Sequence, residues 1–232
     1  KNKKYYFKQQ IETTKDLLQR NKRTVWSVNT ASFKGAHFAV YPPELIETPI
    51  DSSCPEVMLA AAKAGAGLLN DVRSFRREGA LDAVLKTGLP IVLMHMQGEP
   101  QDMQKNPIYD NVVEDVHSFL LERVNECQSF GINTSKIIVD PGFGFGKTLN
   151  NNFELINNLE SVRVKNLPLL VGTSRKSMIG SVLNKEPNER LYGGLALTTL
   201  AVHKGANIIR THDVAPTQDV IDMVYALDST KK

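Results

Sequence analysis

Cysteine, tryptophan and long apolar runs are all scarce in this sequence. Its 232 residues include two cysteines, Cys54 and Cys127, and neither has a spacing typical of metal ligands. So few thiols exclude a disulfide scaffold and favour a reducing compartment, so a cytoplasmic protein is expected. No run of about 18 apolar residues is present, so no membrane span is expected. The charged N-terminal segment also lacks the apolar core of a signal peptide.

Strong charge of one sign is missing as well. The formal net charge is +3, and residues 1–23 hold eight Lys/Arg and two Asp/Glu, which leaves −3 for the rest. A nucleic-acid-binding domain spreads its positive charge more widely, so no nucleic-acid partner is expected and the basic segment is interpreted as a solvated helix. Hydrophobic residues make up 41% of the chain, which is enough for a sizeable core and excludes disorder.

Short apolar runs alternate with helical patterns from about residue 47 onward. The runs are apolar on both faces, as is typical of parallel strands buried on both sides. The predicted strands are 48–52, 67–72, 90–95, 136–141, 168–173 and 207–212. The predicted helices are 55–64, 80–86, 111–130, 152–164, 189–204 and 217–227.

Six βα units in succession indicate an α/β protein, either a doubly wound sheet or a (β/α)8 barrel. One domain is expected over residues 1–232, with recognisable units from 48 to 230 and an atypical segment at 1–47. Residues 24–30 and 36–41 are strand candidates, but the gap between them is too short for a parallel crossover. For a TIM barrel, the first two βα units must therefore be atypical or incomplete.

Polar residues close the predicted strands, at the end where parallel α/β folds bind their ligands. Burying so many carboxylates and amides without a ligand would cost several kcal/mol, so a polar pocket at one barrel mouth is expected. The residues are Asp51, Asn70, Asp71, His95, Asp140, Ser174 to Ser177, Arg210 and His212.

Each of these side chains also has an interpretation that needs no ligand. Asp51 would cap the next helix, and residues 70–71 would form an Asx turn. His95 is more often a structural histidine than a catalytic one. Asp140 would start a turn, and Arg210 would form a buried ion pair. Their joint occurrence at strand ends weakens these alternatives.

Two loops add chemistry to this mouth. Residues 140–147 carry three glycines, which fit a tight backbone that a flat ligand can approach, with Phe145 against an aromatic ring. The match of this loop to a phosphate-binding loop is weak. Residues 174–177 open a helix with two hydroxyls, a guanidinium and an ammonium, a cluster that favours anions unless it is only a solvated basic turn. Arg210 and His212 follow the last strand, where barrels commonly hold phosphate.

Six segments of the chain carry motifs of one family: IDSSCPEV (50–57), LNDVRS (69–74), LMHMQG (93–98), DPGFGFGK (140–147), SRKSMIG (174–180) and IRTHDV (209–214). Together, in this order and over about four-fifths of the chain, they resemble the bacterial dihydropteroate synthases. The resemblance implies a (β/α)8 barrel, a homodimer and a transferase of folate biosynthesis. That enzyme joins a pterin diphosphate to p-aminobenzoate and releases pyrophosphate.

The resemblance also implies roles for single residues. Asp51, Asn70 and Asp140 are expected to bind the pterin edge, and Lys176 its carbonyl side. Arg210 and His212 are expected to hold the pyrophosphate, so Lys176, Arg210 and His212 are the expected catalytic residues. Ser177 and Phe145 are expected beside p-aminobenzoate, where sulfonamides compete.

The N-terminal segment departs from the family pattern. Two loops of the family, NVTPDSFSDGG and GGESTRPG, have no clear counterpart, and residues 27–33 are only a distant echo of the first. Mg²⁺ is the expected cofactor, because it commonly assists a pyrophosphate leaving group, and Asn29 is the candidate ligand. Two alternatives stay open: a synthase-like barrel that binds pterin without turnover, and a corrinoid-type methyl-transfer domain that shares the pterin clamp.

Overall fold

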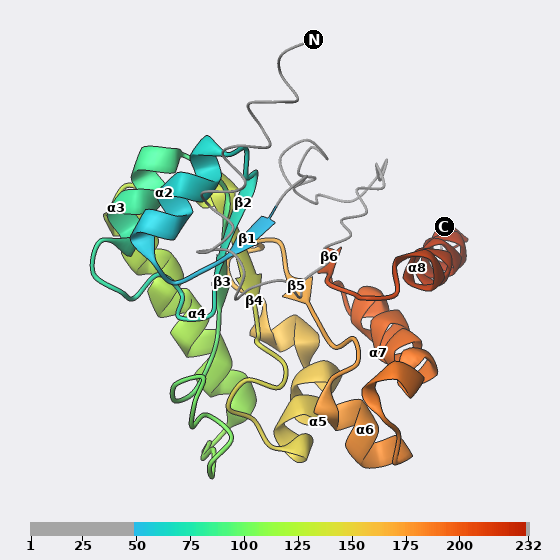
Figure 1. Cartoon of the computed structure of the whole chain (residues 1–232). Helices are drawn as coiled ribbons and strands as arrows, with labels where there is room; N and C mark the ends of the chain where they lie inside the picture. Colours follow the sequence, from blue (N-terminus) through green and yellow to red (C-terminus); the bar gives the residue numbers. More distant parts are fainter. Residues whose placement is uncertain (1–48, 231–232) are drawn as a thin grey trace.

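A parallel arc of six strands organises residues 49–230, which are the residues that this computed structural model describes. Strands β1 (Pro49–Asp51), β2 (Leu68–Asp71), β3 (Ile91–Met94) and β4 (Ile137–Asp140) pair in that order. Strands β5 (Leu170–Val171) and β6 (Ile208–Ile209) form a second parallel pair. A parallel bridge between Val139 and Leu169 joins the two sheets, so the strands follow one another in chain order (Figure 1).

Helices alternate with these strands and lie outside the arc (Figure 1). They are α2 (Pro55–Lys63), α3 (Ala80–Thr87), α4 (Val112–Ser129), α5 (Leu149–Asn157), α6 (Ser177–Leu183), α7 (Leu191–His203) and α8 (Val214–Asp228). Short 3-10 turns cover Thr134–Lys136, Leu159–Val162 and Pro187–Glu189.

The predicted elements are confirmed, with shifted ends. Helix α5 begins three residues before the predicted start, because Thr148 and Asn151 form a reciprocal capping box. Helix α8 begins at Val214 rather than at residue 217, and Pro216 fits its first turn, where no intrahelical N–H donor is needed. The strands are shorter than the predicted ranges, because those ranges also include flanking residues that are not paired, such as Pro90 and His95 around β3.

The two faces of the arc have separate apolar clusters. Successive strand residues point to opposite faces. The inner cluster takes one residue from each of five strands, and the outer cluster packs the strands against the helices. The inner residues are Leu68, Val92, Ile138, Leu170 and Ile208, all almost fully buried.

This architecture confirms the predicted α/β fold of the (β/α) barrel class. The described residues supply six of its βα units, and the two strand candidates at 24–30 and 36–41 lie outside them. Between residues 49 and 230, no helix combines the length and the apolar character that a bilayer crossing requires.

Candidate functional site

Polar side chains continue the inner face of the arc just beyond its apolar layer. Asn70 lies two residues after Leu68, Asp140 two after Ile138, and Arg210 two after Ile208, so each shares the inward side of its strand. Asp51 is in register with Asn70 on the neighbouring strand. The arc therefore brings the polar ends of β1, β2, β4 and β6 together at one mouth.

Three polar atoms in this layer are buried without a hydrogen-bond partner in the described part of the chain. They are Nδ2 and Oδ1 of Asn70 and Oδ2 of Asp140. The other carboxylate oxygen of Asp140 accepts the backbone N–H of Gly142 at 2.7 Å. Leaving such groups unpaired costs about 1–3 kcal/mol each, so this face is built to receive a ligand with complementary donors and acceptors.

Arg210 reaches into the layer across the end of β5. A Cβ atom at Gly172 would lie 2.9 Å from Nε of Arg210, so a larger residue here would displace the guanidinium from this position. Nη2 of Arg210 lies 3.9 Å from Oδ2 of Asp140, which is too long for a hydrogen bond. Burial raises the pKa of Asp51, and the charge of Arg210 opposes that rise.

Asp71 follows the ligand-free interpretation instead. It occupies the outward side of β2, and its carboxylate accepts the backbone N–H groups of Arg73 and Phe75 at 2.9 and 2.8 Å. The hydroxyl of Ser53 also donates to it. Asp71 therefore makes the Asx-type turn, whereas Asn70 does not. Asp51 caps no helix, because the N-cap of α2 is Cys54.

Lys176 forms the next wall of the mouth, at the N-cap of α6. Its ammonium donates to the carbonyl of Phe143 and lies 4.7 Å from the centre of the Phe145 ring. Burial, reinforced by the charge of Arg210, lowers the pKa of Lys176 to about 7, while Asp140 opposes the shift. Ser177, the first residue of α6, is exposed beside it.

Two glycines of loop 140–147 lie close to the backbone of a neighbouring segment. A Cβ atom at Gly142 would lie 1.9 Å from the carbonyl oxygen of His95, and one at Gly146 would lie 2.3 Å from that of Gln97. Both glycines also have positive φ, at 68° and 60°. They therefore allow the loop to press against the backbone that follows β3, and the close approach is to protein rather than to a flat ligand.

His95 makes internal contacts of the kind that its ligand-free interpretation predicts. It is buried, its Nδ1 lies 2.8 Å from Nζ of Lys147, and its ring meets Phe119 edge-on at 5.0 Å. Burial, and then the charge of Lys147, lower the pKa of His95 to about 2. Lys147 is a residue that the sequence reasoning missed: it is 3% exposed, and burial lowers its pKa well below the ordinary value.

The predicted anion cluster is only partly assembled. Ser174 Oγ accepts the backbone N–H of His212 at 3.2 Å and lies 3.1 Å from its Nδ1. Burial, and then Arg175, lower the pKa of His212. Arg175 itself binds Asp213, with Nε 3.2 Å from Oδ2, and that contact lowers the pKa of Asp213. Arg175 thus ties the loop after β5 to the loop after β6.

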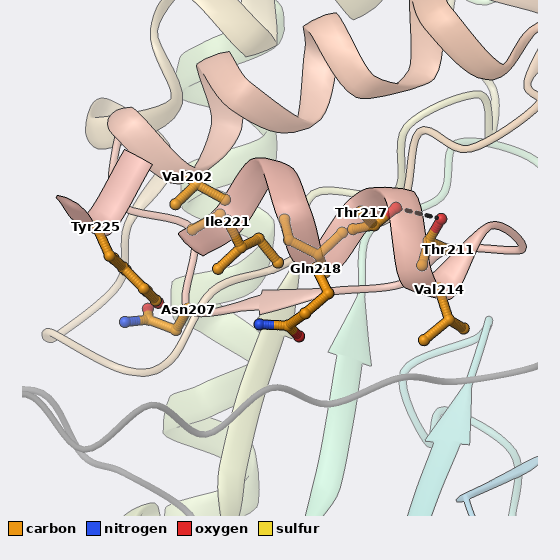
Figure 2. Close-up of a pocket in the computed structure, with 10 residues that line it drawn as sticks. Val202, Asn207, Thr211, Val214, Thr217, Gln218, Ile221 and Tyr225 are labelled. Atoms are coloured by element: carbon orange, nitrogen blue, oxygen red, sulfur yellow. Dashed lines mark hydrogen bonds between the residues drawn. The ribbon is translucent and has the colours of Figure 1, made fainter. Parts of the chain in front are cut away.

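A separate crevice between β6, α7 and α8 is not the candidate site. Its walls are mainly apolar, with Val202, Ile221 and Tyr225 on one side, and Thr211 and Thr217 share a hydrogen bond of 3.0 Å at its end (Figure 2). None of the predicted site residues lines it.

No group of three or more His, Cys, Asp or Glu side chains could hold a metal ion within residues 49–230. The candidate metal ligand, Asn29, lies outside these residues.

Fold and site together define a barrel-type α/β protein with a polar mouth at the carboxyl ends of its strands. The sequence profile of the family described as "Pterin binding enzyme" matches residues 45–212. The chain belongs to the pterin binding enzyme family.

Relatives of this chain include dihydropteroate synthases. That of Escherichia coli K12 is 49% identical over 183 residues, which are 79% of this chain and 65% of the relative. That of Haemophilus influenzae is 48% identical over 177 residues, or 76% of this chain and 64% of the relative. The chain thus spans slightly less than two-thirds of the length of these curated relatives.

Solved structures give the same result. A Yersinia pestis dihydropteroate synthase in a sulfonamide drug complex superposes with a TM-score of 0.77 at 45% identity, covering 78% of this chain and 66% of that one. A Xanthomonas albilineans enzyme in complex with 7,8-dihydropteroate gives a TM-score of 0.73 at 42% identity, covering 78% and 67%.

Proposed function

We propose that this protein is a dihydropteroate synthase, which condenses 6-hydroxymethyl-7,8-dihydropterin diphosphate with p-aminobenzoate and releases pyrophosphate. The observation that carries the proposal is the set of unpaired buried atoms on Asn70 and Asp140 at a mouth that also holds Lys176 and Arg210. The relatives and the solved structures with sulfonamide and dihydropteroate support it.

Asp51, Asn70 and Asp140 bind the pterin in this proposal. A pterin edge offers N–H donors to the carboxylates and both a donor and an acceptor to the amide, which matches the unpaired atoms. Lys176 lies close enough to Asp140 for their charges to interact, so it is placed to contact the carbonyl side of the same ring.

Arg210 and His212 hold the diphosphate. Both follow β6, and His212 lies next to the hydroxyl of Ser174, three residues before the start of α6. The C–O bond to pyrophosphate breaks at the exocyclic methylene of the pterin, and the departing oxygen takes the bonding electrons. Fixed positive charge close to that oxygen stabilises the anion as it forms.

The aryl amine then attacks the methylene carbon and loses a proton, so no protein nucleophile is needed. Phe145 and Ser177 are the proposed walls of the p-aminobenzoate subsite, on either side of Lys176. Their contribution is to orient a flat reactant, because a correctly held amine turns a bimolecular step into an effectively unimolecular one.

Mg²⁺ remains part of the proposal. This ion is usually bound through one or two protein side chains together with phosphate oxygens and waters, so a diphosphate would supply most of its ligands. It would neutralise charge on the leaving group. The free thiols of Cys54 and Cys127 fit the reducing, cytoplasmic compartment that we also propose.

A homodimer is proposed through the adjoining helices α6 and α7. Large apolar side chains are exposed there, including Val182 (58%) and Tyr192 (76%), and a second copy of the chain would cover them. Sedimentation of the whole chain should show a dimer that Tyr192→Lys weakens. A monomer at all concentrations would contradict this part of the proposal.

Pyrophosphate release measured by a coupled assay tests the activity. Release that requires both substrates is expected. Pterin binding without release would instead identify a synthase-like binding protein, and no pterin binding at all would overturn the proposal.

A further inference from the structure

Five consecutive carbonyl groups of the glycine-rich loop, from Gly142 to Gly146, each accept a hydrogen bond from a side chain. Nζ of Lys147 donates to those of Gly142 and Phe145, at 3.0 and 3.1 Å. Tyr109 Oη donates to that of Gly146 at 2.6 Å. Lys176 donates to that of Phe143 and Gln104 to that of Gly144.

Most amide N–H groups of the same loop are bound as well. Gly142 donates to Asp140 at 2.7 Å, Gly144 donates to Asn152 Oδ1 at 2.7 Å, and Phe145 donates to the Gly142 carbonyl at 3.1 Å. A loop of three glycines would otherwise have many accessible conformations, because glycine loses the most backbone entropy on ordering. Hydrogen bonds from several separate elements therefore fix this one.

Lys147 differs from the other donors in two ways. It alone contacts both sides of the Phe143–Gly144 segment, and its third contact, 2.8 Å to Nδ1 of His95, ties the loop to the residue after β3. It is also almost fully buried, although a lysine is among the residues least often found inside a protein. Burial of an amine is costly, so a structure that keeps it there needs these three bonds.

We propose that Lys147 is a positioning residue for the aryl-amine subsite: by bonding the carbonyls of Gly142 and Phe145 and the ring of His95, it holds the Phe145 ring in the orientation that p-aminobenzoate requires. The proposal rests on the proposed function, because that function makes Phe145 a wall of the subsite. Lys147 acts from behind the loop and does not touch the substrate.

The test compares Lys147→Met with Lys136→Met. Methionine keeps the length of the side chain and removes its donors, and Lys136 is an exposed lysine at the opposite end of β4 whose Nζ donates to the Gly88 carbonyl. Two quantities are measured: amide hydrogen exchange at Gly144 and Phe145, and the KM values for p-aminobenzoate and for pterin diphosphate.

Lys147→Met should speed exchange at both amides about tenfold and raise KM for p-aminobenzoate about tenfold, while KM for the pterin changes less than about threefold. Lys136→Met should change neither. Unchanged exchange in a folded Lys147→Met protein, or equal changes in both KM values, would overturn the proposal.

Tyr109→Phe is the second variant, and it carries the test if Lys147→Met does not fold. It removes only the hydroxyl that binds Gly146. KM for p-aminobenzoate should therefore again rise more than KM for pterin diphosphate, but by less than in Lys147→Met. Unchanged amide exchange together with equal KM changes for the two substrates would count against the role proposed for these loop hydrogen bonds. If the unmodified chain binds neither substrate, the proposed function fails, and the exchange measurement alone then decides whether Lys147 fixes the loop.

Discussion

The inner strand ends and the glycine-rich loop adjoin at Asp140, but they differ in whether their polar groups have hydrogen-bond partners within the protein. At the strand ends, Asn70 has both side-chain polar atoms buried without a partner in the described part of the chain. In the loop, five consecutive carbonyls and three amide groups are bound within the protein.

This difference indicates that the two regions of the mouth have different roles. Unpaired buried groups reduce stability and are retained where a ligand completes them. A fully bonded loop contributes rigidity, which lowers the ordering cost when a ligand binds. Under the proposed function, the strand ends form the recognition surface and the loop forms a preformed wall. Substitutions should then have opposite effects on stability in the two regions.

The largest effect is expected from Asn70→Leu. Pterin affinity should fall about 100-fold because a donor and an acceptor are both lost, while unfolding free energy should rise by about 1 kcal/mol because the buried unpaired groups disappear. Calorimetric titration and urea unfolding measure the two quantities.

Asn152→Leu is the matched control, because Asn152 is equally buried but accepts from Gly144 and donates to the Thr148 carbonyl. It should lower the unfolding free energy by about 2 kcal/mol. If both leucine variants destabilise the protein alike, the contrast between the two regions is wrong.

A smaller loss, about 10- to 30-fold in pterin affinity, is expected for Asp140→Asn, since one charged acceptor becomes neutral without a change in shape. The amide oxygen can still accept the N–H of Gly142, so the loop should keep its place. Calorimetry of the pterin titration checks the loss. An affinity that matches the unmodified chain would remove Asp140 from the pterin site.

The affinity for pterin diphosphate should change by about tenfold over two pH units. Lys176, with its pKa lowered to about 7, is neutral above that pH and charged below it. A bound anion raises this pKa, so affinity for pterin diphosphate should be level below pH of about 7 and fall from there to about pH 9, with proton uptake on binding.

Lys176→Arg is the control for this pH dependence, because arginine stays charged throughout and should flatten the decline. The His212 ring, whose pKa is lowered, titrates at lower pH and leaves this window unaffected. An identical slope in both proteins would show that Lys176 is not the titrating group.

The smallest effect is expected from Ser177→Ala, about threefold on p-aminobenzoate, the size of one exposed hydrogen bond. Pterin affinity should not change, because Ser177 lies at the exposed start of α6 rather than among the strand ends. Steady-state kinetics with each substrate varied in turn would show it. Equal losses for both substrates would contradict the placement of this residue.

The order of strands and helices could be predicted from the sequence because buried parallel strands are apolar on both faces. Their ends could not, since the predicted ranges include residues beyond the paired ones: β6 contains only Ile208–Ile209 of the predicted 207–212, and Arg210 to His212 after it are polar. The start of α5 was missed because the capping partner of Thr148 is Asn151 rather than the commoner Glu or Gln.

The candidate site was predictable in its strand-borne part and not in its loops. Alternation along β2 places Asn70 inward and Asp71 outward once the register is known. The role of Gly142 and Gly146 depends on the backbone of residues 95–97, which is distant in sequence and leaves no local signal. For the same reason, the contact between Lys147 and His95 could not be inferred, because these two residues are 52 positions apart in the sequence.

A crystal structure of the whole chain with a bound pterin tests the central claim most directly. The account predicts that the heterocycle lies flat against the inner strand ends, with its hydrogen-bonding edge on Asn70 and on the free carboxylate oxygen of Asp140. A pterin bound elsewhere, with those atoms still unpaired, would contradict it.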